Sequence, residues 1–176
     1  SGLQGAFSSE ATIQKITVAD EKGIWLTIEG AALDWNRLDL LRGRFSVNEL
    51  SAERIAVERA PEPLPPDPEL PEAAATPFSL PELPVAIELG LIKAERIELG
   101  AALAGTEASL RVEGSLRLAD GALDTKLEAV RLDKPGDHLR LEAGYADETQ
   151  QITLDLTADE AAGGLISRSL DLPGNP

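Results

Sequence analysis

The chain has 176 residues, 43% of them hydrophobic, and a formal net charge of −15 from 31 acidic and 16 basic side chains. This charge opposes the phosphate contacts on which nucleic-acid binding depends, so DNA and RNA are excluded as partners. Cysteine is absent, which excludes disulfides and thiolate metal sites, while the hydrophobic content suffices for a folded core.

The first residues are Ser1 and Gly2, and the sequence contains no methionine. We therefore expect a fragment excised from a longer protein. No run of about 18 apolar residues occurs, so the sequence predicts no membrane-spanning helix within these residues. Any membrane anchor is expected outside the fragment.

Residues 1–60 are predicted to form an amino-terminal β unit. Apolar residues recur on both sides of a polar turn at residues 20–23, which predicts a hairpin. A helical turn is predicted over residues 36–42, where Gly43 ends it, and two short strands follow.

Residues 61–84 are predicted to form a linker, because they hold nine of the twelve prolines. Proline lacks a backbone donor and has a fixed φ, so this segment can neither join a sheet interior nor form a helix. Two placements remain open for it: a loose loop, or a segment lying across the mouth of the groove discussed below.

Residues 85–158 are predicted to form an antiparallel meander that includes about four strands separated by turns at 120–121, 135–137 and 147–150. Residues 159–176 are expected to form a short helix and a tail. The helix is predicted over residues 159–170, interrupted by Gly163 and Gly164.

The meander is strongly amphipathic. Charged or polar side chains occupy one parity of each strand, and aliphatic side chains occupy the other. Helix is too scarce to cover this sheet, so either the sheet curls onto its own apolar face or an outside molecule fills it. The residues predicted to line the apolar groove are Leu110, Val112, Leu116, Leu118, Leu127, Leu139, Leu141, Ile152, Leu154 and Leu156.

The tetrapeptide Ala-Glu-Arg-Ile occurs twice, at residues 52–55 and 94–97, and each copy opens an apolar run. A repeat with this spacing of 42 residues is typical of arrays that grow by stacking similar units. A binding surface is therefore favoured over a catalytic cleft.

Catalytic signatures are absent from the sequence. His138 is the one histidine, and neither a second histidine nor a cysteine is available to complete a triad or a metal site. The glycine segments at Gly121, Gly136 and Gly163-Gly164 lie in predicted turns or helix breaks, and none forms a phosphate-binding loop. We expect neither an enzyme nor a bound cofactor or metal.

Several fragments of the sequence resemble the amino-terminal periplasmic region of the TamB family, which belongs to the wider AsmA-like group. The resemblance covers nearly the whole chain and consists of patterned fragments, without a catalytic signature. The fragments are IQKITVAD at 13–20, GIWLTIE at 23–29, LDW at 33–35, LLRGR at 40–44, LSAERI at 50–55, PFSLPELPV at 77–85 and GSLRL at 114–118.

The resemblance implies a mainly β fold: a curved antiparallel meander of repeated strands that forms an apolar-lined, taco-shaped groove, with one or two short helices. It further implies a periplasmic location, with an inner-membrane anchor outside this fragment. TamB-like proteins partner TamA-like outer-membrane barrels through regions also outside it. The family has been assigned both to phospholipid carriage between the membranes and to assembly of outer-membrane proteins such as autotransporters.

Three functions remain open at this stage. In the first, phospholipid acyl chains lie in the apolar groove, which acts as a passive conduit. In the second, the chain is a structural scaffold or chaperone that binds client strands by β-augmentation, without lipid carriage. In the third, it is a spacer that holds the entrance of the groove near the inner membrane.

Overall fold

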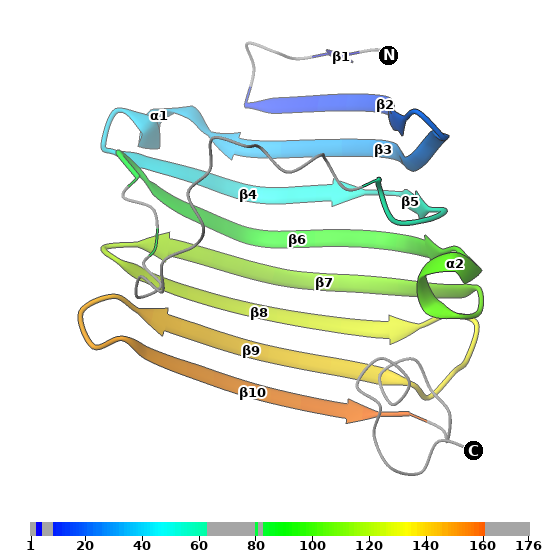
Figure 1. The fold of residues 1–176 in the computed structure, drawn as a ribbon. Coiled ribbons are helices and arrows are strands. Elements are labelled where there is room, and N and C mark those ends of the chain that lie inside the picture. The colour runs from blue at the N-terminus through cyan, green and yellow to red at the C-terminus, as the bar shows by residue number, and fades with distance from the viewer. Residues whose placement is uncertain (1–2, 5–8, 63–79, 81–82, 161–176) are drawn as a thin grey trace, which may run out of the picture.

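The fold is a single curved sheet of ten strands in the computed structural model, which describes residues 3–4, 9–62, 80 and 83–160 (Figure 1). The prediction of a mainly β fold with one or two short helices is confirmed. The strands are β1 (Leu3–Gln4), β2 (Glu10–Asp20), β3 (Gly23–Asn36), β4 (Arg44–Ala52), β5 (Arg54–Val57), β6 (Ala86–Leu99), β7 (Ala108–Ala119), β8 (Ala122–Arg131), β9 (His138–Ala146) and β10 (Gln151–Asp159).

Most neighbouring strands are antiparallel, as the meander prediction requires. The four strands β7 to β10 follow one another without a register shift, joined by the predicted turns. At the Asp120-Gly121 turn, both residues have positive φ, a conformation that glycine adopts freely and aspartate tolerates in tight turns.

The centre of the sheet departs from the purely antiparallel expectation. Both β4 and β5 pair with β6 in parallel, so the strands before and after the predicted linker form one continuous sheet. A parallel pair needs a crossover of a dozen or more residues, and residues 58–85 provide one. The proline-rich segment thus connects two neighbouring strands of the same sheet.

Two one-turn helices lie at the ends of strands and cover neither face of the sheet (Figure 1). Helix α1 (Arg37–Leu40) falls within the predicted helical turn at 36–42, and the Asn36 side chain caps it by accepting from the backbone N–H of Leu38. Helix α2 (Ala101–Ala104) joins β6 to β7.

The helix predicted over 159–170 has only its first two residues in the described part of the chain. Asp159 is the last residue of β10, and the segment from residue 161 onward lies outside the described residues. Among the residues described, no helix is long and apolar enough to cross a membrane.

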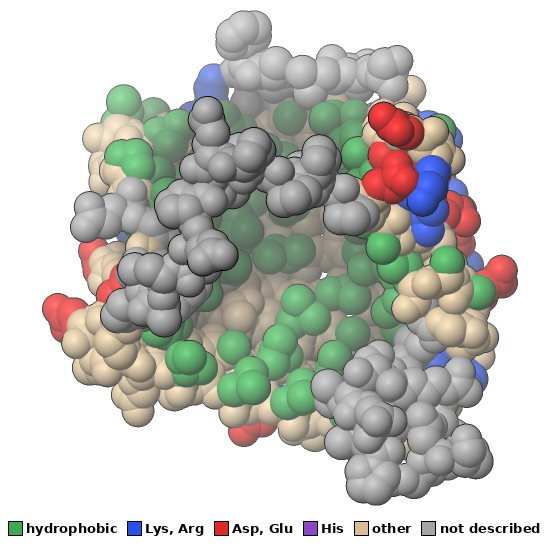
Figure 2. Space-filling view, viewed as in Figure 1, with side chains coloured by type: hydrophobic (Ala, Val, Ile, Leu, Met, Phe, Trp, Pro, Cys, Tyr) green, Lys and Arg blue, Asp and Glu red, His purple; other side chains and the backbone are tan. Residues whose placement is uncertain are grey.

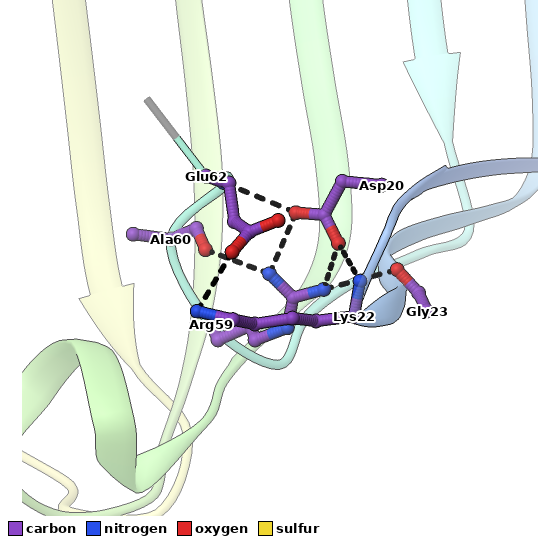
Figure 3. Close-up of polar contacts among 6 residues, drawn as sticks. All are labelled: Asp20, Lys22, Gly23, Arg59, Ala60 and Glu62. Carbon is purple, nitrogen blue, oxygen red and sulfur yellow. Dashed lines mark hydrogen bonds and ion pairs between the residues drawn. The ribbon is translucent and has the colours of Figure 1, made fainter. Parts of the chain in front are cut away.

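A polar clamp holds the chain where it leaves β5 (Figure 3). The Asp20 carboxylate accepts from the Arg59 guanidinium at 2.8 Å, from the Glu62 backbone N–H at 3.0 Å and from the Lys22 backbone N–H at 2.9 Å. Lys22 also pairs with Glu62 at 2.8 Å. Hydrogen bonds from Arg59 hold the pKa of Asp20 well below its usual value, so the carboxylate stays charged.

Candidate functional site

One face of the sheet is aliphatic from β6 to β10, because the cross-strand register aligns the apolar parity of each strand with that of the next. Leu118 pairs with Leu123, Leu123 with Tyr145, and Tyr145 with Ile152. Directly paired residues point to the same side of a sheet, so such rows form a continuous surface. We call this surface the apolar trough.

All ten residues predicted to line a groove lie on the apolar trough, since each belongs to the parity that these rows share. Figure 2 shows this face of the molecule, hollowed at its centre and lined with hydrophobic side chains. The structure therefore brings the predicted set together on one side of the sheet.

The trough extends beyond the predicted set onto β4, β5 and β6. Six residues of β4 and β5 pair one to one with six residues of β6, and those six pair in turn with the trough parity of β7. The additional lining residues are Phe45, Val47, Leu50, Ala52, Ile55 and Val57, followed by Ile87, Leu89, Ile92, Ala94, Ile97 and Leu99.

Simple alternation misses these residues because the strands contain bulges. In β6 the register against β7 shifts between Leu89 and Ile92 and again between Ala94 and Ile97. Each shift adds one residue to β6, so the apolar position moves to the other parity. The same three-residue separation between apolar positions recurs in β4 and β5. This interruption of the alternation is the sequence signal from which these residues could have been identified.

The trough is not covered by a second layer within the described residues. No large side chain there is fully buried, and the buried hydrophobic residues are mostly alanines. Exposure is greatest on β10, where Ile152, Leu154 and Leu156 are 72%, 67% and 47% exposed. An apolar surface this continuous is typical of a binding site.

A pocket of about 740 Å³ crosses β6 to β10 along one transverse row of the sheet. The row runs from Leu89 and Leu116 through Thr125 and Ala143 to Leu154. Most of the other lining residues, among them Arg117, Lys126 and Glu142, belong to the parity of the opposite, charged face.

The opposite face carries ion pairs that run across the strands. Arg54 bridges Glu29 at 3.1 Å and Glu98 at 2.6 Å, and Lys15 extends the chain of charges by pairing with Glu29 at 3.1 Å. Lys15, then Arg54, lowers the pKa of Glu29, and Arg54 lowers that of Glu98. The charges favour contact of this face with water.

A cluster of polar residues lies at the margin of the trough where β8 is connected to β9. Arg131 lies on the trough parity opposite Leu110, yet its side chain is only 5% exposed. It pairs with Asp133 and lies 3.7 Å from a carboxylate oxygen of Asp137. The Asp133 carboxylate also accepts from the Ser109 backbone N–H at 3.0 Å. The sequence analysis did not anticipate this buried cluster.

Tyr145 and Asp147 mark the other end of the trough, at the turn between β9 and β10. Burial first, then the neighbouring Asp147 carboxylate, raises the pKa of the Tyr145 phenol. The same carboxylate accepts from the backbone N–H of Leu80 at 3.1 Å, and Leu80 is buried. Leu80, within the proline-rich segment, is therefore attached to this turn.

The one histidine of the chain lies at the start of β9, beside the last residue of β10. The exposed side chains of His138 and Asp159 form a pair at 2.9 Å. Within the described residues, no three histidine, aspartate or glutamate side chains are grouped so that they could hold a metal ion. The chain matches no protein-family model, no curated protein and no solved structure. The resemblance to the TamB family therefore rests on the sequence fragments quoted above.

Proposed function

We propose that the chain is a periplasmic segment of a TamB-like protein, anchored to the inner membrane through a region outside these residues. In this role the apolar trough is a passive conduit for phospholipid acyl chains passing between the inner and outer membranes. Such a protein meets its TamA-like partner through other regions. The single observation that carries the proposal is the aliphatic face that continues across β6 to β10 without a covering layer among the described residues.

The free energy of acyl-chain burial in the trough favours a ligand that is held but can slide. Burial of one methylene is worth about 0.8 kcal/mol, so partial contact along an acyl chain supplies several kcal/mol without any fixed polar anchor. Aliphatic side chains offer no directional bond, and successive positions along the trough are therefore similar in free energy. A lipid held in this way is retained but remains free to move.

The chemical contrast between the two faces supports the same function. Cross-strand ion pairs, including Lys126 with Glu142 at 3.4 Å and Arg140 with Glu128 at 3.5 Å, occupy the opposite face of the same strands. The net charge of −15 also disfavours attachment to anionic lipid headgroups. Contact with lipid is therefore expected through acyl chains.

The test compares one added carboxylate on each face. Leu141→Asp places a charge in the trough between Leu127 and Leu156, whereas Thr157→Asp places the same charge on the opposite face of β10. Native mass spectrometry of the chain purified without detergent would measure bound phospholipid. We expect Leu141→Asp to lose roughly tenfold or more of the bound lipid and Thr157→Asp to retain it, because an unpaired charge is costly in an apolar contact.

Circular dichroism must show that both variants are folded. Undiminished phospholipid on folded Leu141→Asp protein would contradict the conduit. Absence of phospholipid from the unmodified chain, including after incubation with phospholipid vesicles, would also contradict it.

A further inference from the structure

Leucine side chains are exposed at the helical turn between β3 and β4. Leu38 and Leu41 are 66% and 85% exposed, and Leu41 is the most exposed large hydrophobic residue in the described part of the chain. The turn lies where these two strands end, so it covers neither face of the sheet (Figure 1). These leucines therefore belong neither to the apolar trough nor to a core.

Local hydrogen bonds hold the turn in one conformation. The backbone N–H groups of residues 41–43 donate to the carbonyls three residues earlier at 2.9–3.2 Å, and Gly43 ends the turn with a φ of 72°. Leu38 and Leu41 are three residues apart, so their side chains lie on the same side of the turn. Because this turn is already ordered, little conformational entropy is lost when a partner covers it.

Arginines flank the exposed leucines. Residues 37–44 contain three arginines and one aspartate, a formal charge of +2 in a chain whose net charge is −15. Arg42, whose side chain is 69% exposed, lies 3.3 Å from the Asp39 carboxylate, and Arg44 lies 3.9 Å from the same carboxylate oxygen. One carboxylate cannot neutralise two guanidinium groups, so basic charge remains beside the leucines. We call residues 37–44 the α1 tip.

The combination of exposed leucines and exposed arginines matches the interface of a phospholipid bilayer. Leucine side chains are favoured among the upper acyl chains, and guanidinium groups bind headgroup phosphates through charge-assisted hydrogen bonds. Each basic side chain near the surface also favours a bilayer that contains anionic lipid.

The basic charge is confined to the α1 tip. The acidic residues Glu88, Asp120 and Asp147 line the pocket that Arg42 and Arg44 border. These carboxylates and the acidic net charge oppose adsorption of the sheet itself to an anionic surface. Contact with such a surface is therefore restricted to the tip.

We infer that the α1 tip inserts into the interface of a phospholipid bilayer that contains anionic lipid. Leu38 and Leu41 lie among the upper acyl chains, and the arginines contact the headgroup phosphates. The contact holds one end of β3 and β4 at the membrane surface. It uses no residue of the apolar trough, so it is independent of the conduit.

The test uses the absence of cysteine, since one introduced cysteine can carry a polarity-sensitive fluorophore. Leu40→Cys labels the tip and keeps Leu38 and Leu41. Leu103→Cys is the matched control, because Leu40 and Leu103 are both 40% exposed on one-turn helices, while residues 100–106 carry no charge.

The probe is a vesicle of phosphatidylethanolamine and phosphatidylglycerol, titrated to millimolar lipid because a contact of this size is weak. We expect the label at position 40 to shift to the blue and its fluorescence to rise about twofold or more, as the fluorophore enters an apolar environment. The label at position 103 should not respond, and phosphatidylcholine vesicles should give a smaller response at position 40.

Substitutions in the Leu40→Cys protein separate the two parts of the contact. Leu41→Asp should abolish the response, and Arg42→Gln should weaken vesicle affinity roughly fivefold. Arg111→Gln is the control for charge, because this half-exposed arginine pairs with Glu95 on the opposite face of the sheet, and it should leave the affinity unchanged. Leu141→Asp should also leave it unchanged, which separates the tip from the conduit.

Circular dichroism must show that the variants are folded; if Leu41→Asp protein is not, the comparison of Arg42→Gln with Arg111→Gln decides. Equal responses at the two labelled positions, an equal response to phosphatidylcholine vesicles, or full affinity in folded Leu41→Asp or Arg42→Gln protein would overturn the inference. Absence of any response would overturn it as well and favour a protein partner for the exposed leucines.

Discussion

Ala52 and Ala94 lie side by side in the sheet, paired in parallel register across β4 and β6. They are the first residues of the two Ala-Glu-Arg-Ile copies, and the paired Ile55 and Ile97 are the last. The sequence offset of the repeat, 42 residues, is therefore also the register of the parallel join. The repeat therefore corresponds to two neighbouring, parallel-paired segments of the sheet that share the same bulge pattern.

The first prediction concerns this join. Ala94→Asn places a polar amide at a buried position between Ala52 and Val112, where little room or water is available. We expect a loss of about 1–3 kcal/mol in the free energy of unfolding, measured by urea denaturation, because the amide would lose its hydrogen bonds to water.

Glu95→Asn is the matched control, since it introduces the same side chain at the next residue, on the ion-paired face of β6. Its partners Lys93 and Arg111 are solvent-accessible, so its stability should change little. Equal destabilisation by the two substitutions would contradict the assignment of faces at the bulge.

The alternation of β7 to β10 could be predicted from sequence because these strands are regular. Most of their alternate positions are apolar and recognisable turns separate them, so one rule finds both the strands and their apolar face. The ten predicted trough residues all come from these four strands for this reason.

The rest of the trough was not predictable in the same way. A bulge such as that between Leu89 and Ile92 changes parity without changing composition, and only the partner strand reveals it. The parallel join was also hidden, because hairpin signals describe neighbours in sequence and say nothing of strands separated by a long linker. Arg131 shows a third limit: its charge suggests solvent exposure, whereas two nearby carboxylates stabilise it in a buried position.

The second prediction concerns pH and the Arg54 bridge. Glu29 and Glu98 both have a pKa below the usual 4.5, to which Arg54 contributes, so the folded state binds their protons less readily than the unfolded state. Their contribution to stability is therefore complete at neutral pH and is lost as the pH falls through 4.5 and the lowered folded pKa values.

Arg54→Gln should consequently destabilise the protein at pH 7 and have a smaller effect near pH 3, where the carboxylates become protonated. Urea midpoints of the variant and the unmodified chain at the two pH values provide the measurement. A stability difference that is the same at both pH values would show that Arg54 acts by packing instead of charge.

The third prediction concerns the clamp at the end of β5. Asp20→Ala removes the acceptor that holds the backbone N–H groups of Lys22 and Glu62. We expect both amides to exchange with deuterium faster, since their partner is lost, while amides within β7 and β8 keep their protection.

Glu21→Gln is the control for this experiment, because it changes a neighbouring carboxylate in the same turn that forms no hydrogen bond or ion pair with Arg59 or Glu62 among the described residues. It should leave both exchange rates unchanged. Unaltered exchange in Asp20→Ala protein would mean that other contacts hold the start of the proline-rich segment at this turn.

The fourth prediction concerns Gly100, which follows β6 beside the end of β5. Its N–H donates to the Val57 carbonyl at 2.8 Å, and a Cβ added there would clash with the Glu58 carbonyl oxygen. Because the obstacle is backbone, it cannot be relieved by turning a side chain. Gly100→Ala should therefore lower the free energy of unfolding by roughly 1–3 kcal/mol.

Gly90→Ala provides the comparison within β6, since its added Cβ would approach the Asn48 carbonyl oxygen only to 3.3 Å. A shift of a few tenths of an ångström relieves that contact, so we expect a change below about 1 kcal/mol, with alanine also restricting the unfolded chain. Urea denaturation of the two variants measures the difference. If Gly100→Ala were as stable as Gly90→Ala, the ends of β5 and β6 would have to lie farther apart than the parallel pairing of Val57 with Leu99 places them.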